Sequence, residues 1–521
     1  METYKQPIKE LSRKLIWQHA VSSLTQNRIN IRVLKPNYMD NLWEYCNDIL
    51  STYCPEIKLD GNHYEDWKKY SNIVYRNKKA EQLKVAFFCG PEPDNDVTNL
   101  LRLGVRLENI YAFENNKICF SSAVKSLHDN YPQMKIFNGK IEDFASLNSV
   151  MFDIIYLDFT GSLFTEFRTI FAILDSNVLS EQCIFAVNTS YPDITPENVD
   201  NLASYVLRQS MPEYKSLFGD DGDGYGYQGY AGIYTESYEY YGFQDSNEFK
   251  EIIKKNFNNV YSSFQTHSIL DYAVRIKPAF ALVNCELLKK RLFCSDIENV
   301  LSKGENYNNM FVSHIIANKP LLSYRLEAIA SNKWIDFFTK TATGGKYNRI
   351  NSVKLMEFFR NAPYEEFKDV FSDVLAENLE KINANTIDNK YGGRFFCDVP
   401  MIHLWLEMLF YQQGYPYHHN SENHRRYSYT AKKHRMCLDI FTFDRCRAFY
   451  DWLPILEYYA EGMNVVERQI ISRMCMDAIN KHSIYVMNDL YSGAALVGIN
   501  EYPWSRNKTI ALREDLNKNL S

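Results

Sequence analysis

The sequence lacks several features that would place it in a familiar class. It has no run of the roughly 20 apolar residues that crosses a bilayer, and its first residues carry no apolar signal-peptide core. Its 11 cysteines include no CxxC pair and no regular spacing, which argues against a zinc finger or a disulfide framework. Positive charge is not in excess, since 58 Lys and Arg face 64 Asp and Glu. We therefore expect a cytoplasmic protein with reduced thiols, no membrane partner and no metal, in which nucleic-acid binding would need a local basic patch.

The length of 521 residues suggests about three domains. Residues 1–80 have the apolar spacing of helices and are expected to form an N-terminal helical cap. Residues 81–286 alternate short apolar segments with helical ones and contain a Gly/Tyr-rich insertion at 212–245. Residues 287–521 carry helical apolar stripes without strand alternation, so we predict a large, mainly helical C-terminal domain.

The middle region predicts an α/β fold with a doubly wound sheet. Its expected strands are KVAFFC, NIYAFE, MKIFNG, FDIIYLDF and CIFAVN. Helical segments separate them, and the first of these, DVTNLLRLG, ends at Gly104. This alternation favours a parallel sheet covered by helices on both faces. A further helix, SNEFKEIIKKNF, and two strand-like segments, VYSSFQTHS and AFALVNCEL, close the unit.

The loop after the first strand is poor in glycine. Residues 89–96, CGPEPDND, contain one glycine, two prolines and three acids. Prolines remove backbone donors, and the acids would repel a phosphate, so P-loop and dinucleotide sites are excluded. A cationic ligand without phosphate suits this loop better. Alternatively, Asp94 or Asp96 simply caps the following helix.

Five strand–helix units closed by a helix and a strand pair resemble the class I S-adenosylmethionine-dependent methyltransferase fold. The resemblance covers Lys84 to Glu286, about two-fifths of the chain, and rests on element order, because the first loop departs from the family's glycine-rich motif. It implies S-adenosylmethionine as cofactor, held at the carboxyl ends of the strands. The residues implied for it are Cys89, Gly90, Pro91 and Asp94 in the first loop, Glu114 and Asn115 at the ribose, and Ile141, Glu142, Asp143 and Phe144 at the adenine. Alternatively, Glu114 is a solvated strand end, and Asp143 and Phe144 are a helix cap and a core residue.

The fourth strand ends in the sequence DFTGS, which begins at Asp158. It is similar to the Asp-Pro-Phe-Gly-Ser motif of some transfer-RNA guanine methyltransferases, although Thr160 changes the pattern. The similarity implies that Asp158 accepts a proton or hydrogen bond from a substrate amine, with Phe159 stacking beside it. Asn188, at the end of the fifth strand, would orient the substrate. Alternatively, Asp158 satisfies backbone amides and Asn188 closes a turn.

The acids of the Gly/Tyr-rich insertion, Asp220, Asp221 and Asp223, lack the spacing of a calcium-binding loop. Because long glycine-rich loops beside active sites are often lids, we expect this segment to cover the site.

A basic and aromatic segment stands out at 414–437, GYPYHHNSENHRRYSYTAKKHRMC. Cations meet phosphates and tyrosines offer stacking faces, the combination used on RNA or single-stranded DNA. The residues expected to bind nucleic acid are Arg425, Arg426, Tyr427, Tyr429, Lys432, Lys433 and Arg435. A zinc site with His418, His424, His434 and Cys437 lacks finger spacing. The alternative is a solvated loop between helices.

The sequence thus predicts a methyltransferase-like protein that acts on a macromolecule, with nucleic acid as the favoured substrate. The extra helical region argues against a small-molecule enzyme. The alternative function is a catalytically inactive Rossmann scaffold within a multiprotein assembly, since the glycine-poor loop would allow loss of the cofactor. Its Tyr-, Asn-, Ile- and Lys-rich composition is typical of AT-rich bacterial genomes, whose antiviral and mobile loci often encode such accessory proteins.

Overall fold

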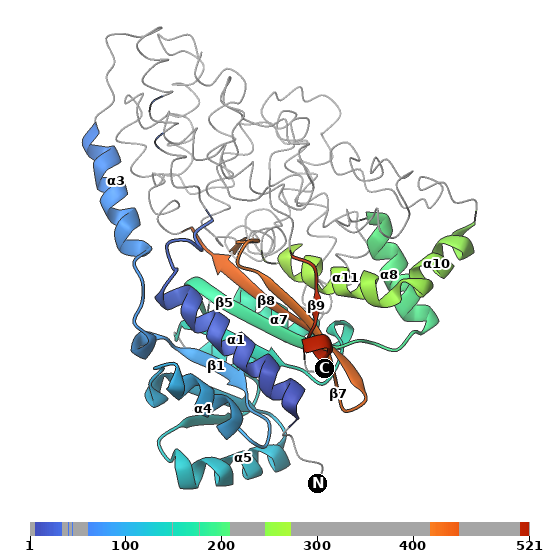
Figure 1. The fold of residues 1–521 in the computed structure, drawn as a ribbon, viewed down its shortest axis with the longest axis horizontal. Helices are drawn as coiled ribbons and strands as arrows, with labels where there is room; N and C mark the ends of the chain where they lie inside the picture. Colours follow the sequence, from blue (N-terminus) through green and yellow to red (C-terminus); the bar gives the residue numbers. More distant parts are fainter. Residues whose placement is uncertain are drawn as a thin grey trace, which may run out of the picture.

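The computed structural model describes residues 6–33, 40, 44, 61–147, 150–176, 178–208, 245–271, 273, 417–446 and 511–519. Figure 1 shows a central sheet with helices on both of its faces. The helices expected over 287–416 and 447–510, and the Gly/Tyr-rich insertion except for its last residue, lie outside the described residues. Within the described residues, no helix is long and apolar enough to span a membrane.

The described sheet has nine strands in the order β3-β2-β1-β4-β5-β8-β7-β9, with β6 also paired to β8. The strands are β1 Val85–Phe88, β2 Ile110–Glu114, β3 Lys135–Asn138, β4 Phe152–Asp158, β5 Leu179–Ser190, β6 His418–His419, β7 Arg425–Ala431, β8 His434–Asp444 and β9 Glu514–Asp515. The first five strands pair in parallel. This half of the fold is therefore as predicted from the sequence.

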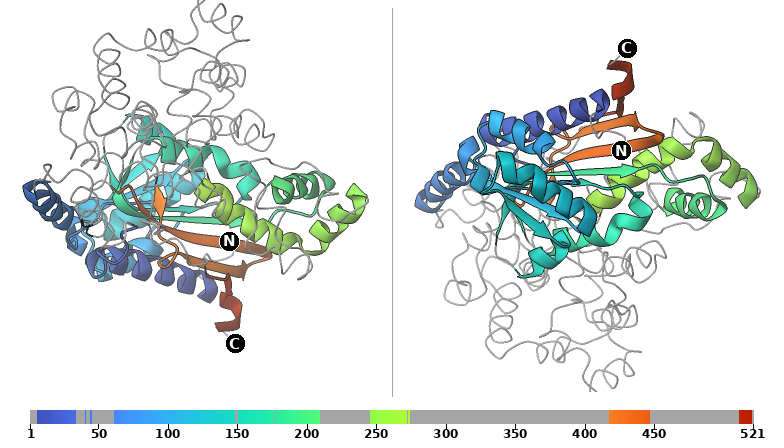
Figure 2. Two further views of the ribbon diagram at one scale, coloured as in Figure 1. Left: turned by 90° about the horizontal axis from the view of Figure 1, so that it is seen from above. Right: turned by 90° about the horizontal axis from the view of Figure 1, so that it is seen from below.

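The described helices pack on the two faces of the sheet in separate layers, except α3, which belongs to neither core and extends away from the sheet in Figure 1. They are α1 Pro7–Thr25, α3 Gly61–Val74, α4 Asp94–Arg102, α5 Lys117–Asn130, α6 Ile141–Leu147, α7 Leu163–Asp175, α8 Pro196–Arg208, α10 Ser246–Lys255 and α11 Phe257–Asp271, with short 3₁₀ turns η1 Ala80–Gln82, η2 Leu107–Asn109 and η7 Leu516–Asn519. One core joins α1, α4 and α5 to the sheet, and the other joins α6, α7, α8, α10 and α11. The two views of Figure 2 agree with this three-layer arrangement.

The closing strands were predicted in the wrong place. Residues 260–268, expected to be a strand, belong to helix α11, and residues 279–287 lie outside the described part of the chain. The sheet is completed instead by β7 and β8, from the region predicted to be a separate helical domain. Strand β8 runs antiparallel to β5, and β7 runs antiparallel to β8. The result is a mixed, mostly parallel sheet, consistent with the class I methyltransferase fold.

The first and last described segments are parts of this core. Helix α1 inserts Trp17, which is fully buried, edge-on against Phe87 of β1 and Tyr156 of β4. Strand β9 pairs in parallel with β7, and Leu516 is buried behind it. Residues 6–25 therefore pack on the sheet itself, and the hairpin of β7 and β8 is held from both sides.

Candidate functional site

The candidate site lies at the carboxyl edge of β1, β2, β4 and β5, where open α/β sheets bind ligands. Alternating residues of a strand face opposite sides of the sheet. On β1 and β4, Phe87 and Tyr156 face α1 and α4, so Cys89, Asp158 and, in register on β5, Asn188 face the same side. Helices α1 and α4 thus cover this face of the sheet near the edge.

The first loop turns tightly beside β2. The Cys89 N–H donates to the Phe113 carbonyl at 3.2 Å, and Gly90 adopts φ +57°, a left-handed conformation that favours glycine. Cys89 is buried, and this burial together with the Glu114 carboxylate raises the pKa of its thiol. Because its thiol is buried and protonated, Cys89 is a packing residue. The single glycine of the loop occupies the position whose left-handed backbone favours glycine.

The two acids of α4 do not cap the helix. The residue before α4 is Pro93, and no side chain there bonds to the first turn. Asp94 accepts a hydrogen bond from Ser126 at 2.7 Å, while its Oδ1 is buried with no partner among the described residues. Asp96 is only 3% exposed and accepts from the Trp17 indole at 2.8 Å. Asp96 therefore anchors α1, and a ligand role for Asp94 stays a prediction.

Glu114 stands at the end of β2, half-buried, opposite Asn138 of β3. Its Oε1 accepts the Asn116 N–H at 2.8 Å, and Gly139 donates its N–H to the Glu114 carbonyl. Asn115 is exposed. Asn116, which the sequence analysis did not single out, caps α5 by accepting from two backbone amides at 2.9 and 3.1 Å. One oxygen of Glu114 is thus fixed by the loop.

The segment predicted at the adenine divides into core and surface. Ile141 is fully buried in the core. Phe144 packs on Phe137 with ring centroids 4.8 Å apart. Glu142 accepts from Thr169 at 3.0 Å, and Asp143 is exposed. Phe144 packs as its core alternative has it, and the ligand roles of Ile141, Glu142 and Asp143 stay predictions.

Asp158 is held by hydrogen bonds that reach it from β5 and β7. Ser12, which donates to the Lys9 carbonyl at 2.9 Å, interacts with the Tyr429 hydroxyl. Tyr429 in turn accepts from the Asn188 Nδ2 at 2.8 Å, and the same nitrogen donates to Asp158 Oδ1 at 2.7 Å. Burial and the nearby Asp158 raise the pKa of Tyr429, which keeps its proton. Asp158 therefore accepts at one oxygen, as a carboxylate does.

This geometry corrects two predicted roles. Asn188 is completely buried, so it orients Asp158 and does not touch a substrate. Phe159 is 7% exposed and packs edge-on against Phe88, in the core on the face of the sheet opposite Asp158. The expected stack of Phe159 beside Asp158 is not formed. Asp158 itself is half-buried at the edge.

Helix α1 brings a cation to this edge that the sequence analysis missed. Arg13 contacts Asp96 with its Nε at 3.4 Å and is 8% exposed. Burial alone would lower the pKa of Arg13, but Asp96, Tyr156 and Asp158 outweigh it and raise this pKa. The available signal was spacing, because Arg13 lies one helical turn before the buried Trp17 and so shares its face.

Residues 425–437 of the basic segment lie in the β7–β8 hairpin. Some of these side chains are buried, and others are exposed at the tip of the hairpin. Arg426 is 4% exposed and Tyr429 2% exposed, so neither can meet a phosphate or a base, and their predicted nucleic-acid contacts are wrong. Tyr427 is 9% exposed, and Arg425, at the far end of β7, donates to two backbone carbonyls. Among the described basic residues and tyrosines of this segment, the exposed ones are the tip residues Lys432, Lys433, His434 and Arg435.

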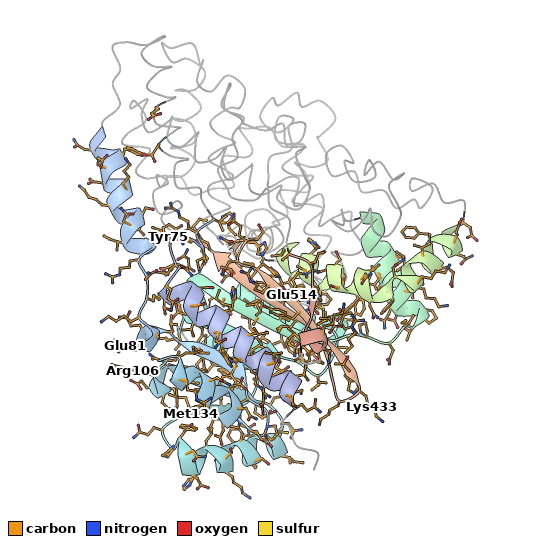
Figure 3. All side chains as sticks on the ribbon, in the orientation of Figure 1. Tyr75, Glu81, Arg106, Met134, Lys433 and Glu514 are labelled. Atoms are coloured by element: carbon orange, nitrogen blue, oxygen red, sulfur yellow. The ribbon has the colours of Figure 1, made fainter. Side chains whose placement is uncertain are left out.

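The tip stands on the same edge as Asp158. Strand β5 ends at Ser190, opposite Met436, and the next N–H, of Tyr191, donates to the Arg435 carbonyl at 2.9 Å. The Arg435 guanidinium lies 5.0 Å from the Tyr191 ring centroid. Figure 3 shows Lys433 at the outer end of the hairpin. Three cations are thus presented two strands away from β4.

Behind the hairpin lies a buried charge cluster. Asp439 accepts from Arg513 at 2.8 Å, Gln265 at 2.8 Å and Thr266 at 2.7 Å. Burial would raise the pKa of Asp439, but Arg513, His424 and Arg426 hold it well below its usual range. The described residues contain no group of His, Cys, Asp and Glu that could hold a metal ion. His424 instead contacts Asp439 at 3.1 Å, so it belongs to this buried cluster.

Comparison with known proteins gives partial structural matches. No protein-family model and no curated protein matches the sequence. A conserved hypothetical protein of Streptococcus pyogenes is similar over 22% of this chain and 70% of its own, with 19% identity and a TM-score of 0.19. An S-adenosylmethionine-dependent methyltransferase of Clostridium acetobutylicum ATCC 824 is similar over 32% of this chain and 63% of its own, with 15% identity and a TM-score of 0.18.

Arabidopsis thaliana protein arginine methyltransferase 10 is similar over 30% of this chain and 48% of its own, with 18% identity and a TM-score of 0.17. The chain therefore spans less than two thirds of either methyltransferase. TM-scores this low support no conclusion about function. The strand order and the direction of β8 are what make the sheet methyltransferase-like.

Proposed function

We propose that the protein binds S-adenosylmethionine at the carboxyl edge of β1, β2 and β4 and methylates nucleic acid there. One observation carries the proposal: the half-buried Asp158 and the cationic hairpin tip lie on the same edge of a methyltransferase-like sheet. A reacting group and a phosphate-binding surface are thereby within reach of one polymer.

The residues present fit the cofactor's charges. Asp94 is the first residue of α4, directly after the first loop, and Glu114 ends β2, which pairs with β1. Each has a carboxylate oxygen without a partner among the described residues. Carboxylates suit ribose hydroxyls and cationic groups and disfavour phosphate. When bound, the cofactor would supply a methyl group on a sulfonium, already activated for transfer.

Asp158 would act on the substrate amine. Asn188 occupies its Oδ1 at 2.7 Å and thereby sets the plane of the carboxylate, which leaves Oδ2 to accept a hydrogen bond or the proton lost on methylation. Because Tyr429 keeps the Asn188 amide turned toward Asp158, the acceptor is preorganised.

The hairpin tip would position the polymer. Its turn is braced, since the Lys432 N–H donates to Gln6 at 3.2 Å and the Thr430 N–H donates to Asn517 at 2.8 Å. Fixed cations lose less conformational entropy on binding a phosphate than mobile ones do. Phosphate contacts of this kind position a nucleic acid without reading its sequence.

Methyl transfer can be measured directly. Protein incubated with S-adenosylmethionine carrying a tritiated methyl group should label RNA or single-stranded DNA. Asp158→Asn should lower the rate about 100-fold or more while leaving the affinity for S-adenosylhomocysteine nearly unchanged. Asp193→Asn, an exposed acid on the neighbouring loop, is the matched control and should keep the wild-type rate. Cofactor binding without any labelled polymer would refute the nucleic-acid assignment, and absence of both would favour the scaffold alternative.

A further inference from the structure

Arg13 is a buried cation whose hydrogen-bonding capacity is not used up. Of its guanidinium atoms, Nε faces Asp96 at 3.4 Å, whereas NH1 is buried and has no partner among the described residues. An unsatisfied buried donor on a charged group costs about 1–3 kcal/mol or more. The arginine as a whole is 8% exposed and belongs to the buried residues.

The surroundings of Arg13 belong to the candidate site. Arg13 is carried by α1, which covers the ends of β1 and β4, and Asp96 belongs to the helix that follows the first loop. Its charge interacts with Asp158 and Tyr429 as well as Asp96. On the adjoining strand, the Asn188 Oδ1 is a second buried atom without a partner among the described residues. Arg13 NH1 and Asn188 Oδ1 are thus two buried polar atoms at this edge of the sheet without a partner among the described residues.

We infer that Arg13 binds the carboxylate at the amino-acid end of an adenosyl sulfur ligand, and that this end lies under α1. The inference rests on the proposed cofactor and adds a residue far from the predicted cofactor segments. A charge-assisted bond between a guanidinium and a carboxylate would satisfy NH1.

Two ligands separate this role from a merely structural one. S-adenosylhomocysteine has the amino-acid end, whereas 5′-methylthioadenosine has the same nucleoside and sulfur but lacks it. Titration calorimetry of the whole chain should show that Arg13→Met weakens S-adenosylhomocysteine at least about tenfold and leaves 5′-methylthioadenosine within about twofold. Lys14→Met, which removes an exposed cation from the next position of α1, should change neither affinity.

Arg13→Met leaves Asp96 buried without its cation, so thermal unfolding must accompany the titration. If that variant does not fold, Arg13→Met combined with Asp96→Asn removes both charges and carries the same test. An unchanged affinity for S-adenosylhomocysteine, or an equal loss for both ligands, would overturn the inference while leaving the proposed function standing. If the wild type binds neither ligand, the proposed function falls, and the inference with it.

Discussion

The side-chain amide of Asn188 donates to the carboxylate of Asp158 across 2.7 Å, and so joins the ends of β4 and β5 at the candidate site. The bond is anchored 241 positions further along the chain, because the same amide also donates to Tyr429. Asp158 therefore depends on a hairpin far away in the sequence. The orientation of the candidate catalytic residue therefore depends on the pairing of β7 and β8 with the parallel strands.

Asn188→Asp should make stability depend on pH. The new carboxylate would lie buried beside Asp158, so one of the two must hold a proton, and its pKa rises above the unfolded value. Stability is then fully present below the unfolded pKa of about 4 and is lost as pH rises, at about 1.4 kcal/mol per pKa unit. Urea unfolding should show the variant closer to wild type at pH 5 than at pH 8. A pH-independent difference would contradict the bond, and Asn115→Asp, at an exposed position, is the control.

Tyr429→Phe should destabilise the fold by about 1–3 kcal/mol, because it leaves Asn188 and Ser12 without their buried partner. Tyr427→Phe, two residues away on the same strand face, should change the free energy of unfolding by less than about 0.5 kcal/mol. Thermal or urea unfolding of the two variants decides this. Equal changes in the free energy of unfolding would show that the hydroxyl of Tyr429 does not stabilise the fold.

Asp444 should lower stability as pH rises through the acid range. Burial raises the pKa of Asp444 to about 6, although the N–H groups of Val33 and Cys446 oppose this. Between its ordinary value and 6 the native state holds a proton that the unfolded chain has released, so stability falls with rising pH, by about 3 kcal/mol in all. Unfolding of Asp444→Asn at pH 4 to 7 should lack this component. If the free energies of unfolding of the wild type and of Asp444→Asn change in parallel with pH, Asp444 does not contribute to the pH dependence.

The hairpin tip should govern the salt dependence of nucleic-acid binding. Each lost phosphate contact flattens the log–log salt slope for a single strand by about 0.7. Changing Lys433 and Arg435 together to Ala should therefore reduce the slope by about 1.4, whereas Arg425→Ala, at the opposite end of β7, should leave it unchanged. Fluorescence anisotropy at several salt concentrations gives the slopes. An effect of Arg425 equal to that of the tip would place the contact surface elsewhere.

Local sequence signals predicted the first half of the fold well. The segments for β1 to β5 and for α4, α5 and α7 each combine a clear period with a clear end, such as Gly104 with φ +88° after α4. These elements neighbour one another in sequence and in space. The positions of Glu114 and Asp158 at strand ends followed from the same signals.

The later elements gave misleading signals for physical reasons. Helix α11 is buried on all sides from Val260 to Leu270, so it shows no amphipathic stripe and its aromatic and β-branched residues resemble a strand. The hairpin turns at Lys432, with φ +57°, where a glycine or asparagine normally marks such a turn. Its charges suggested a surface segment, although Arg426 and His424 are buried around Asp439. Pairing over such distances cannot be read from local periodicity.

Calorimetric titration of the pure protein with S-adenosylhomocysteine is the direct test of the proposed cofactor site. We predict binding at micromolar strength, weakened by about 1–3 kcal/mol in Glu114→Ala through the loss of ribose hydrogen bonds. Glu108→Ala, an exposed acid at the opposite end of β2, should bind like the wild type. No heat at millimolar ligand, with the protein folded, would contradict the cofactor site.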